Sequence, residues 1–457
     1  MKQQRGLQWI LLGVVLILWA RPIWAIYNET GLFWWLGTDF ALYHTQSKAL
    51  WSIDPSAIYN QEKLVDIHRQ LLSLYAHDYM GEFSAHVPYP PLYAWLFTPF
   101  TIPPPPVGFL LWESLNLLAA LNLAWRATQF FNKPERLSVA LLLLASYPLM
   151  NSLIVGQPQI LLACAVAESF LSLRAGQDFR AGLWIACLLF KPQYGILLGA
   201  LLIWKRRWYA VLGAILGGGV ILGGSVLVAG IPAFLAYPSA FTEMVGFHSY
   251  DAFRMINWRS FVLWIWPHIA DTVGLSVVLG LGIVTVMLTA LAWRGAWDPS
   301  DRRFPAQVTV LLLATLLANY HSFSYGAIIL AVPLAAVLGK GCPRFVTSLA
   351  VIVGVILPSL AFSLGGHIDG DDSARAALIL KLSLVTCFFA LLIDLLRRDR
   401  VGGTDTSMPS MVTVDSFTGH TAVNASIKIA KRGTNDTAYG KEVSTLPGRE
   451  LCPSTAL

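Results

Sequence analysis

The segment AGLWIACLLFKPQYGILLGALLIW, residues 181–204, decides how the chain is threaded through a membrane. It is apolar apart from a few polar positions, and Lys191 is its only charged residue. A run of about 20 apolar residues is long enough to cross a lipid bilayer. These residues would form a helix of about 36 Å, which suffices for one crossing and not for two. Arg180 and the basic run at 205–207 flank the segment, so both ends belong on the same side of a membrane. A re-entrant pair of half-helices, broken at Lys191-Pro192, satisfies both conditions.

The composition extends this interpretation to the whole chain. Of the 457 residues, 56% are hydrophobic and only 13% are charged, whereas a soluble domain carries about 25% charged residues. We therefore predict an all-α, polytopic membrane protein with about ten complete transmembrane helices besides the re-entrant hairpin. The expected crossings are 7–27, 106–127, 137–153, 159–173, 208–229, 272–293, 304–320, 323–339, 345–364 and 375–396.

The basic residues predict the orientation of these helices. Lys and Arg collect in every second connection, the pattern of cytoplasmic loops, and they form no stripe with interleaved aromatic residues, so the net charge of +6 gives no reason to expect nucleic acid. Ile23 stands where a cleavable signal would need a small residue before Ala25, so the first apolar segment is expected to remain as an anchor. We expect both termini in the cytoplasm and the chain in the plasma (inner) membrane.

One integral-membrane domain is expected over residues 1–400. Its extracytoplasmic loops are 28–105, which contains helices with amphipathic spacing, and 230–271. Residues 401–457 are rich in Ser, Thr and Gly and are expected to form a disordered cytoplasmic tail. The five cysteines include no CxxC pair, so neither a disulfide framework nor a zinc site is indicated.

One acid stands out in the first outer loop. Asp39 lies in GLFWWLGTDFALYH, residues 31–44, among aromatic residues that include Trp35 and Tyr43. Thr38 or Asp39 could simply cap a helix running to Leu50. A cap needs no aromatic neighbours, however, and such rings stack on sugars while a carboxylate binds sugar hydroxyls.

Several cationic groups are further candidates, because ionisable residues near or within the membrane are functional suspects. Lys191 would point from the broken hairpin into the protein. Arg254 and Arg259 could hold a phosphate, or could merely keep their loop soluble. His321 lies in the hinge LLANYHSFSYG and could instead belong to an interfacial aromatic cluster.

Known catalytic fingerprints such as HExxH, GxSxG and the Walker loop are missing from the sequence, so an enzyme here must act on a substrate with an already activated bond. Seven segments carry a resemblance: DFALYHTQSKALW with AIYN after it, YPPLYAWLFTPFTIPP, LLWESLNL, YPLMNSLIVGQPQILL, the hairpin at 181–198, NWRSF and NYHSFSY. In their order and spacing the chain resembles glycosyltransferase family 87, a branch of the GT-C superfamily.

The resemblance implies a membrane transferase that takes a sugar from a polyprenyl-phosphate donor on the extracytoplasmic face and delivers it, with inversion, to a lipid or glycan acceptor. Relatives favour mannose. Besides donor, acceptor and membrane lipids no partner is expected, nor is a cofactor, a protein metal site or a requirement for a divalent cation. The alternatives are an arabinofuranosyl or other pentosyl or hexosyl transferase using the same donors, a glycolipid transporter or flippase, and a polysaccharide polymerase or ligase.

The resemblance also assigns roles to residues of this sequence. Asp39 aligns with the family's catalytic base, and His321 aligns with a family histidine. Arg259, Lys191 and Arg254 are expected to bind the donor phosphate. The residues expected to hold sugar and lipid are Tyr43, Trp35, Tyr89, Tyr93 and Gln157.

The chain departs from the family after His321. Relatives often show the pattern H-x-x-D-Y-D, where this chain has Ser324, Tyr325 and Gly326. A second acid for the acceptor would have to come from elsewhere.

Overall fold

The computed structural model describes residues 2–30, 36–52, 58–75, 89–242, 250–339, 351–365 and 371–401. Helices account for nearly all of this part of the chain, and its only β pairing is an isolated bridge between Met255 and Phe323. The expected tail lies, from residue 402 onward, outside the described residues.

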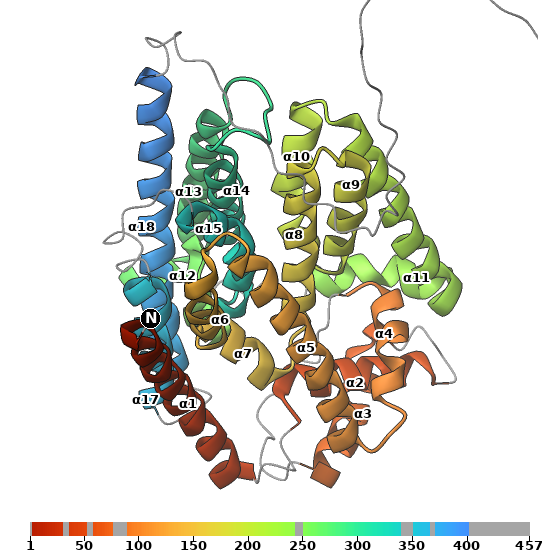
Figure 1. Cartoon of the computed structure of the whole chain (residues 1–457). Coiled ribbons are helices and arrows are strands. Elements are labelled where there is room, and N and C mark those ends of the chain that lie inside the picture. The colour runs from red at the N-terminus through yellow and green to blue at the C-terminus, as the bar shows by residue number, and fades with distance from the viewer. Residues whose placement is uncertain are drawn as a thin grey trace, which may run out of the picture. The chain divides into compact units, whose positions relative to one another are not determined.

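The helices follow one another along the chain, with a few 3-10 and π turns between them (Figure 1). Their bounds are α1 Lys2–Thr30, α2 Thr38–Leu50, α3 Gln61–Tyr75, α4 Pro91–Phe97, η2 Thr98–Phe100, α5 Pro105–Thr128, η3 Lys133–Glu135, α6 Arg136–Leu144, α7 Tyr147–Val155, α8 Gln159–Arg174, α9 Asp178–Ala186, η4 Cys187–Phe190, η5 Pro192–Tyr194, α10 Ile196–Trp204, α11 Trp208–Thr242, η6 Tyr250–Arg254, α12 Trp258–Ile265, α13 Asp271–Ala292, α14 Phe304–Ala318, η7 Ser324–Leu330, α15 Ala331–Leu338, η8 Ile352–Ile356, α17 Leu357–Gly365 and α18 Asp371–Val401.

Five of these helices are long and apolar enough to cross a membrane, namely α1, α5, α11, α13 and α18. In none of them is more than 39% of the apolar window buried inside the protein, so most of that surface faces outward, as a lipid-exposed helix requires. The pair η3–α6 and α7 could make a sixth span, bent by 49°. The all-α, polytopic fold is therefore confirmed, while the expected number of about ten crossings stays a prediction.

The hairpin at 181–204 is broken where the sequence predicts. Helix α9 ends at Ala186, two short 3-10 turns meet at Lys191, and α10 begins at Ile196. Glycines let α9 lie against α11: a Cβ on Gly182 would stand 2.0 Å from the carbonyl oxygen of Ala210. Helix α11 is kinked next to the expected end of the crossing at residue 229, because Gly230 has a non-helical φ of 79°, and a second helical piece follows to Thr242.

The short helices of the predicted outer loops lie together. Helices α2, α3 and α4 occupy the end of the molecule opposite the α13–α14 connection (Figure 1). A hydrogen bond from the Leu92 amide to the Ser225 hydroxyl, 3.2 Å long, ties the start of α4 to α11. The second outer loop is fastened to the hinge between α14 and η7 by a hydrogen bond of 2.8 Å from the Ile256 amide to the Ser322 carbonyl. These contacts tie down segments that carry candidates predicted from the sequence, since α4 holds Tyr93 and the joined second loop and hinge hold Arg254 and His321.

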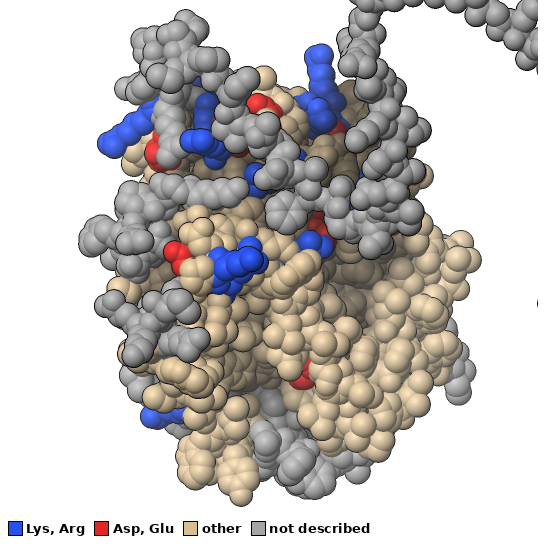
Figure 2. Space-filling view, viewed as in Figure 1, with Lys and Arg blue, Asp and Glu red and all other residues tan. Residues whose placement is uncertain are grey.

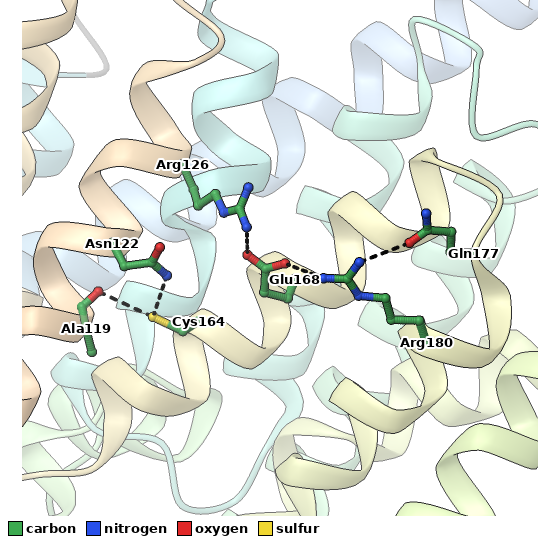
Figure 3. Close-up of polar contacts among 7 residues, drawn as sticks. All are labelled: Ala119, Asn122, Arg126, Cys164, Glu168, Gln177 and Arg180. Carbon is green, nitrogen blue, oxygen red and sulfur yellow. Dashed lines mark hydrogen bonds and ion pairs between the residues drawn. The ribbon is translucent and has the colours of Figure 1, made fainter. Parts of the chain in front are cut away.

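Charged residues gather at the other end. Lys and Arg cluster at the top of the view in Figure 2, the end at which Figure 1 places the α13–α14 connection. Figure 3 shows one group, in which the carboxylate of Glu168 on α8 forms ion pairs with the guanidinium groups of Arg126 on α5, at 2.7 Å, and Arg180 on α9, at 3.7 Å. Arg207 similarly pairs with Asp178 and joins α11 to α9. The basic end of the protein is thus a network that connects neighbouring helices.

Candidate active site

Asp39 lies in the first turn of α2, which begins after Gly37, a residue with a φ of 62°. Since Gly37 occupies the capping position and offers no side chain, the interpretation of Thr38 or Asp39 as the helix cap is not what the structure shows. A carboxylate in the first turn is favoured by the partial positive charge of the helix N-terminus. The acid is only partly buried, so its side chain is available at this end of the helix.

Two glycines allow α2 and the end of α7 to approach each other. Gly156 ends α7 with a φ of 79°, and a Cβ there would lie 2.7 Å from the Cβ of Phe40. A Cβ on Gly37 would lie 3.0 Å from the carbonyl group of Val155. The indole of Trp112 holds the turn by donating to the Gly156 carbonyl at 2.8 Å. This close packing brings residue 157 next to Asp39.

The amide of Gln157 is the centre of a polar network. Its Nε2 donates to Oδ2 of Asp39 at 2.6 Å and to the hydroxyl of Tyr325 at 3.1 Å. Its Oε1 accepts from Nζ of Lys191 at 2.7 Å, and Lys191 also donates to Oε1 of Gln159 at 3.2 Å. Gln157 and Lys191 are 3% and 6% exposed. The network thus joins an acid and a cation inside the protein through one neutral amide.

Aromatic rings surround the network on the side of α2 and α4. Tyr43, Tyr89 and Tyr93 are buried, with the rings of Tyr89 and Tyr93 4.6 Å apart and the hydroxyls of Tyr43 and Tyr89 3.2 Å apart. Burial, reinforced by the charge of Asp39, raises the pKa of all three tyrosines well above its ordinary value, so they remain protonated at neutral pH. Lys191 lies above the rings of Tyr325 at 4.8 Å and Tyr89 at 5.6 Å.

The three tyrosines therefore pack on one another, and Tyr89 also packs on Lys191. Their expected contact with sugar or lipid stays a prediction. Trp35, which was expected to share that role, lies outside the described residues.

His321 lies between α14 and η7, near two cations. Loss of hydration, followed by the charges of Arg259 and Lys191, lowers the pKa of His321 to about 4, so the imidazole is neutral at pH 7. Its ring meets the ring of Phe323 edge-on at 4.9 Å. Arg259, on α12, is fully buried, and its guanidinium lies 4.6 Å from the ring centre of Tyr320. His321, Arg259 and Lys191 thus belong to one electrostatic neighbourhood.

Arg254 is placed differently. It is the last residue of η6 and interacts electrostatically with Tyr147 at the start of α7. Its expected contact with a donor phosphate stays a prediction.

The departure from the family pattern after His321 has a visible counterpart. A Cβ on Gly326 would lie 2.6 Å from the hydroxyl of Tyr194, so an acid at position 326 would collide with that side chain. Ser324 accepts a hydrogen bond of 2.9 Å from the amide of Asn151. Tyr325, between them, contacts Gln157. These contacts fill the place where relatives often carry acids.

Within the part of the chain that the structure describes, His, Cys, Asp and Glu form no group of three or more that could hold a metal ion. The groups that the described part of the site brings together include the carboxylate of Asp39, the buried cations Lys191 and Arg259, the neutral imidazole of His321 and several phenols. They can accept a proton and stabilise an anion.

Comparison with known families agrees with this chemistry. The model of glycosyltransferase family 87 matches residues 87–319, slightly more than half of the chain. The chain belongs to glycosyltransferase family 87. It is therefore a glycosyltransferase, and a placement in the GT-C superfamily fits its helical membrane fold. Neither the curated proteins nor the solved structures include a match.

The matched region contains Gln157, Lys191 and Arg259 but neither Asp39 nor His321. The hydrogen bond to Gln157 in the structure therefore places Asp39 beside the residues that the family model matches. Tyr325 and Gln159 were not among the site residues expected from the sequence. The motif GQPQ, residues 156–159, was the available signal for Gln159, because it holds both glutamines and the glycine that lets α2 approach.

Proposed function

We propose that this member of glycosyltransferase family 87 transfers a sugar, with mannose favoured, from a polyprenyl-phosphate donor to a lipid or glycan acceptor. The observation that carries the proposal is the bond between Asp39 and Gln157, because it places a partly accessible carboxylate beside the buried cation Lys191. A transferase with such a donor needs a base for the acceptor hydroxyl and cations for the departing phosphate.

In the proposed reaction, the acceptor oxygen attacks the anomeric carbon from the face opposite the phosphate. The bond from that carbon to the phosphate oxygen breaks, and its electron pair leaves with the phosphate. The acceptor proton passes to Asp39. The configuration at the anomeric carbon is inverted, and holding the two substrates in line contributes much of the rate.

The cations have a matching role at the other side of the anomeric carbon. Lys191 and Arg259 would stabilise the charge that develops on the phosphate, and neutral His321 would hydrogen-bond to it. A cation held in a poorly hydrated site acts more strongly than one in water. The burial of Lys191 and Arg259 supports this role.

The orientation belongs to the same proposal. We place the Asp39 end outside the cell and the basic end, with Arg126 and Arg180, in the cytoplasm of a plasma (inner) membrane, because basic residues favour the cytoplasmic side. Cysteines introduced at Asp66 and at Arg180 test it, since both side chains are largely exposed. A membrane-impermeant maleimide should label intact cells at position 66 and not at position 180. The opposite pattern would reverse the orientation.

The reaction is tested with purified protein and a set of radiolabelled polyprenyl-phosphate sugars, offered with membrane lipid extract. A labelled glycolipid or glycan, together with release of polyprenyl phosphate, is the expected result. Product from a pentosyl donor alone would replace mannose by that sugar. Donor that binds without being consumed under every condition would contradict transfer and favour the transporter alternative.

A further inference from the structure

We propose that Gln157 is a positioning residue that keeps the carboxylate of Asp39 and the ammonium of Lys191 from pairing directly. The inference rests on the proposed function, because it concerns how the proposed base is kept able to accept a proton. It adds a role for a residue that was expected only to contact sugar or lipid.

The chemistry of the neighbours fixes the orientation of the amide. A carboxylate can only accept and an ammonium can only donate, so the NH₂ of Gln157 must face Asp39 and its carbonyl must face Lys191. The distances of 2.6 Å and 2.7 Å to these two groups agree with that assignment. The Tyr325 hydroxyl receives the second N–H at 3.1 Å. All directional bonding capacity of the amide nitrogen is then used, so the side chain is locked.

The same arrangement leaves Lys191 without a carboxylate among its described hydrogen-bond partners. Its ammonium donates to two amide oxygens, those of Gln157 and Gln159, and lies over the rings of Tyr89 and Tyr325. Two neutral oxygens and two ring faces hold a cation without neutralising it. The charge of Lys191 stays available for an anion.

Direct pairing would impair both groups. An opposite charge within about 4–6 Å favours the ionised form of an acid and makes its carboxylate a weaker base, by about 1–3 pH units. It would also neutralise the cation that faces the phosphate. A neutral amide between the two groups keeps them apart by its own length, so their attraction through space is weaker than in a direct ion pair and each can serve a different substrate atom.

Other groups around this pair would not substitute for Gln157. The phenols that act on Asp39 electrostatically, Tyr43 of α2, Tyr89 before α4 and Tyr93 of α4, are protonated at neutral pH. Lys191 feels the charge of Asp39 through space and acts in turn on His321, which is neutral and is also influenced by Arg259. Residue 157 is therefore the position at which a change of charge reaches both Asp39 and Lys191.

Two substitutions of opposite effect test the inference. In Gln157→Leu, the ammonium is released from the amide and can turn to Asp39; this direct pairing outweighs the loss of the 2.6 Å hydrogen bond to the carboxylate, so the carboxylate should titrate at a pH lower by about 1 unit or more. In Gln157→Glu, a carboxylate pairs with Lys191 and repels Asp39, so the titration should move upward by a similar amount. Gln159→Leu is the matched control, because it removes a contact to Lys191 and none to Asp39.

The first readout needs no substrate. Infrared difference spectra against the same protein carrying Asp39→Asn isolate the carboxyl band of residue 39 in each background. Opposite shifts for Gln157→Leu and Gln157→Glu, with a smaller shift for Gln159→Leu, are the expected result. Equal titration curves in all four backgrounds would overturn the inference and would leave the proposed reaction untouched.

The second readout is the pH–rate profile with the polyprenyl-phosphate donor. Its acidic limb should follow the infrared titration, downward in Gln157→Leu and upward in Gln157→Glu, with activity of the latter partly restored at high pH. A residue that merely supports the fold would lower activity at every pH without moving the limb, and that outcome would refute the positioning role. If wild-type protein shows no turnover while the infrared shifts occur, the proposed function fails and the spacer role stands.

Discussion

Substituting Gly156 by alanine should separate the two halves of the candidate site. The residue ends α7 with a φ of 79°, and the added Cβ would lie 2.7 Å from the Cβ of Phe40 and 3.1 Å from the Phe40 backbone nitrogen. An L-residue in the left-handed region costs about 1–2 kcal/mol, and overfilling a packed contact costs about 1–3 kcal/mol more. The free energy of unfolding of Gly156→Ala should therefore fall by about 2–5 kcal/mol.

Two other glycines separate these contributions. Gly176 has a similar φ of 72° with no atom within 4 Å of its added Cβ, so Gly176→Ala should show only the backbone cost of about 1–2 kcal/mol. Gly199, inside α10, has ordinary helical geometry and equally open space, and Gly199→Ala should be neutral or stabilising.

The assay is chemical unfolding of the purified proteins in a mild detergent, followed by tryptophan fluorescence. The Gly156→Ala protein should also lose transferase activity under conditions where it is folded, because α2 must move away and lengthen the 2.6 Å bond between Asp39 and Gln157. Equal losses of stability in Gly156→Ala and Gly176→Ala would refute the close contact of α7 with α2. Full activity in the folded variant would show that this contact does not position Asp39.

Three further predictions concern charge. Burial is the main cause that lowers the pKa of His44, His68 and His321 to about 4, so between about pH 4 and 6.5 the folded protein binds fewer protons than the unfolded chain. The free energy of unfolding should therefore fall as the pH drops from about 6.5 towards 4. His321→Gln should reduce the slope of this pH dependence by about one proton. Proton uptake measured on unfolding checks this, and an unchanged slope in the variant would contradict it. Glu168→Gln should lower the free energy of unfolding by about 1–3 kcal/mol, because Arg126 and Arg180 lose their shared carboxylate. Arg69→Gln, in an exposed pair with Asp66, should change it by less than about 1 kcal/mol. Similar effects in the two variants would count against the network. Lys191→Met should lower turnover by about 10²–10³-fold, because the departing phosphate loses a stabilising cation while proton transfer to Asp39 is kept. The acidic limb of the pH–rate profile should therefore respond less than in Gln157→Glu, and wild-type turnover would exclude Lys191 from the reaction.

The membrane fold follows from simple features of the sequence. Apolar runs of about 20 residues mark α1, α5, α11, α13 and α18, and a lone lysine followed by proline marks the broken hairpin. The remaining crossings are harder to predict, because α6 and α7 are separate helices bent by 49°, although their sequence reads as one apolar run. Hydropathy reports how much apolar surface a segment has and contains no information on where the segment bends.

The candidate site shows a similar division. Asp39 and Lys191 could be singled out by their position among apolar and aromatic residues. Their connection could not, because it depends on the approach of α7 to α2, which Gly37 and Gly156 permit through backbone geometry. Nor could composition show whether the tyrosines face an open groove: in the structure they pack on one another, and a row of aromatic residues looks the same in either case.

The central claim is that Asp39 is the base, and a comparison of two identical substitutions in the first outer loop tests it directly. Asp39→Asn keeps the size of the side chain and removes its capacity to take a proton, whereas Asp66→Asn makes the same change at an exposed acid of α3. With purified proteins and saturating donor, the rate of sugar transfer should fall by about 10²–10⁴-fold in Asp39→Asn and stay near the wild-type rate in Asp66→Asn. An Asp39→Asn protein that binds donor and turns it over at most of the wild-type rate would contradict the account.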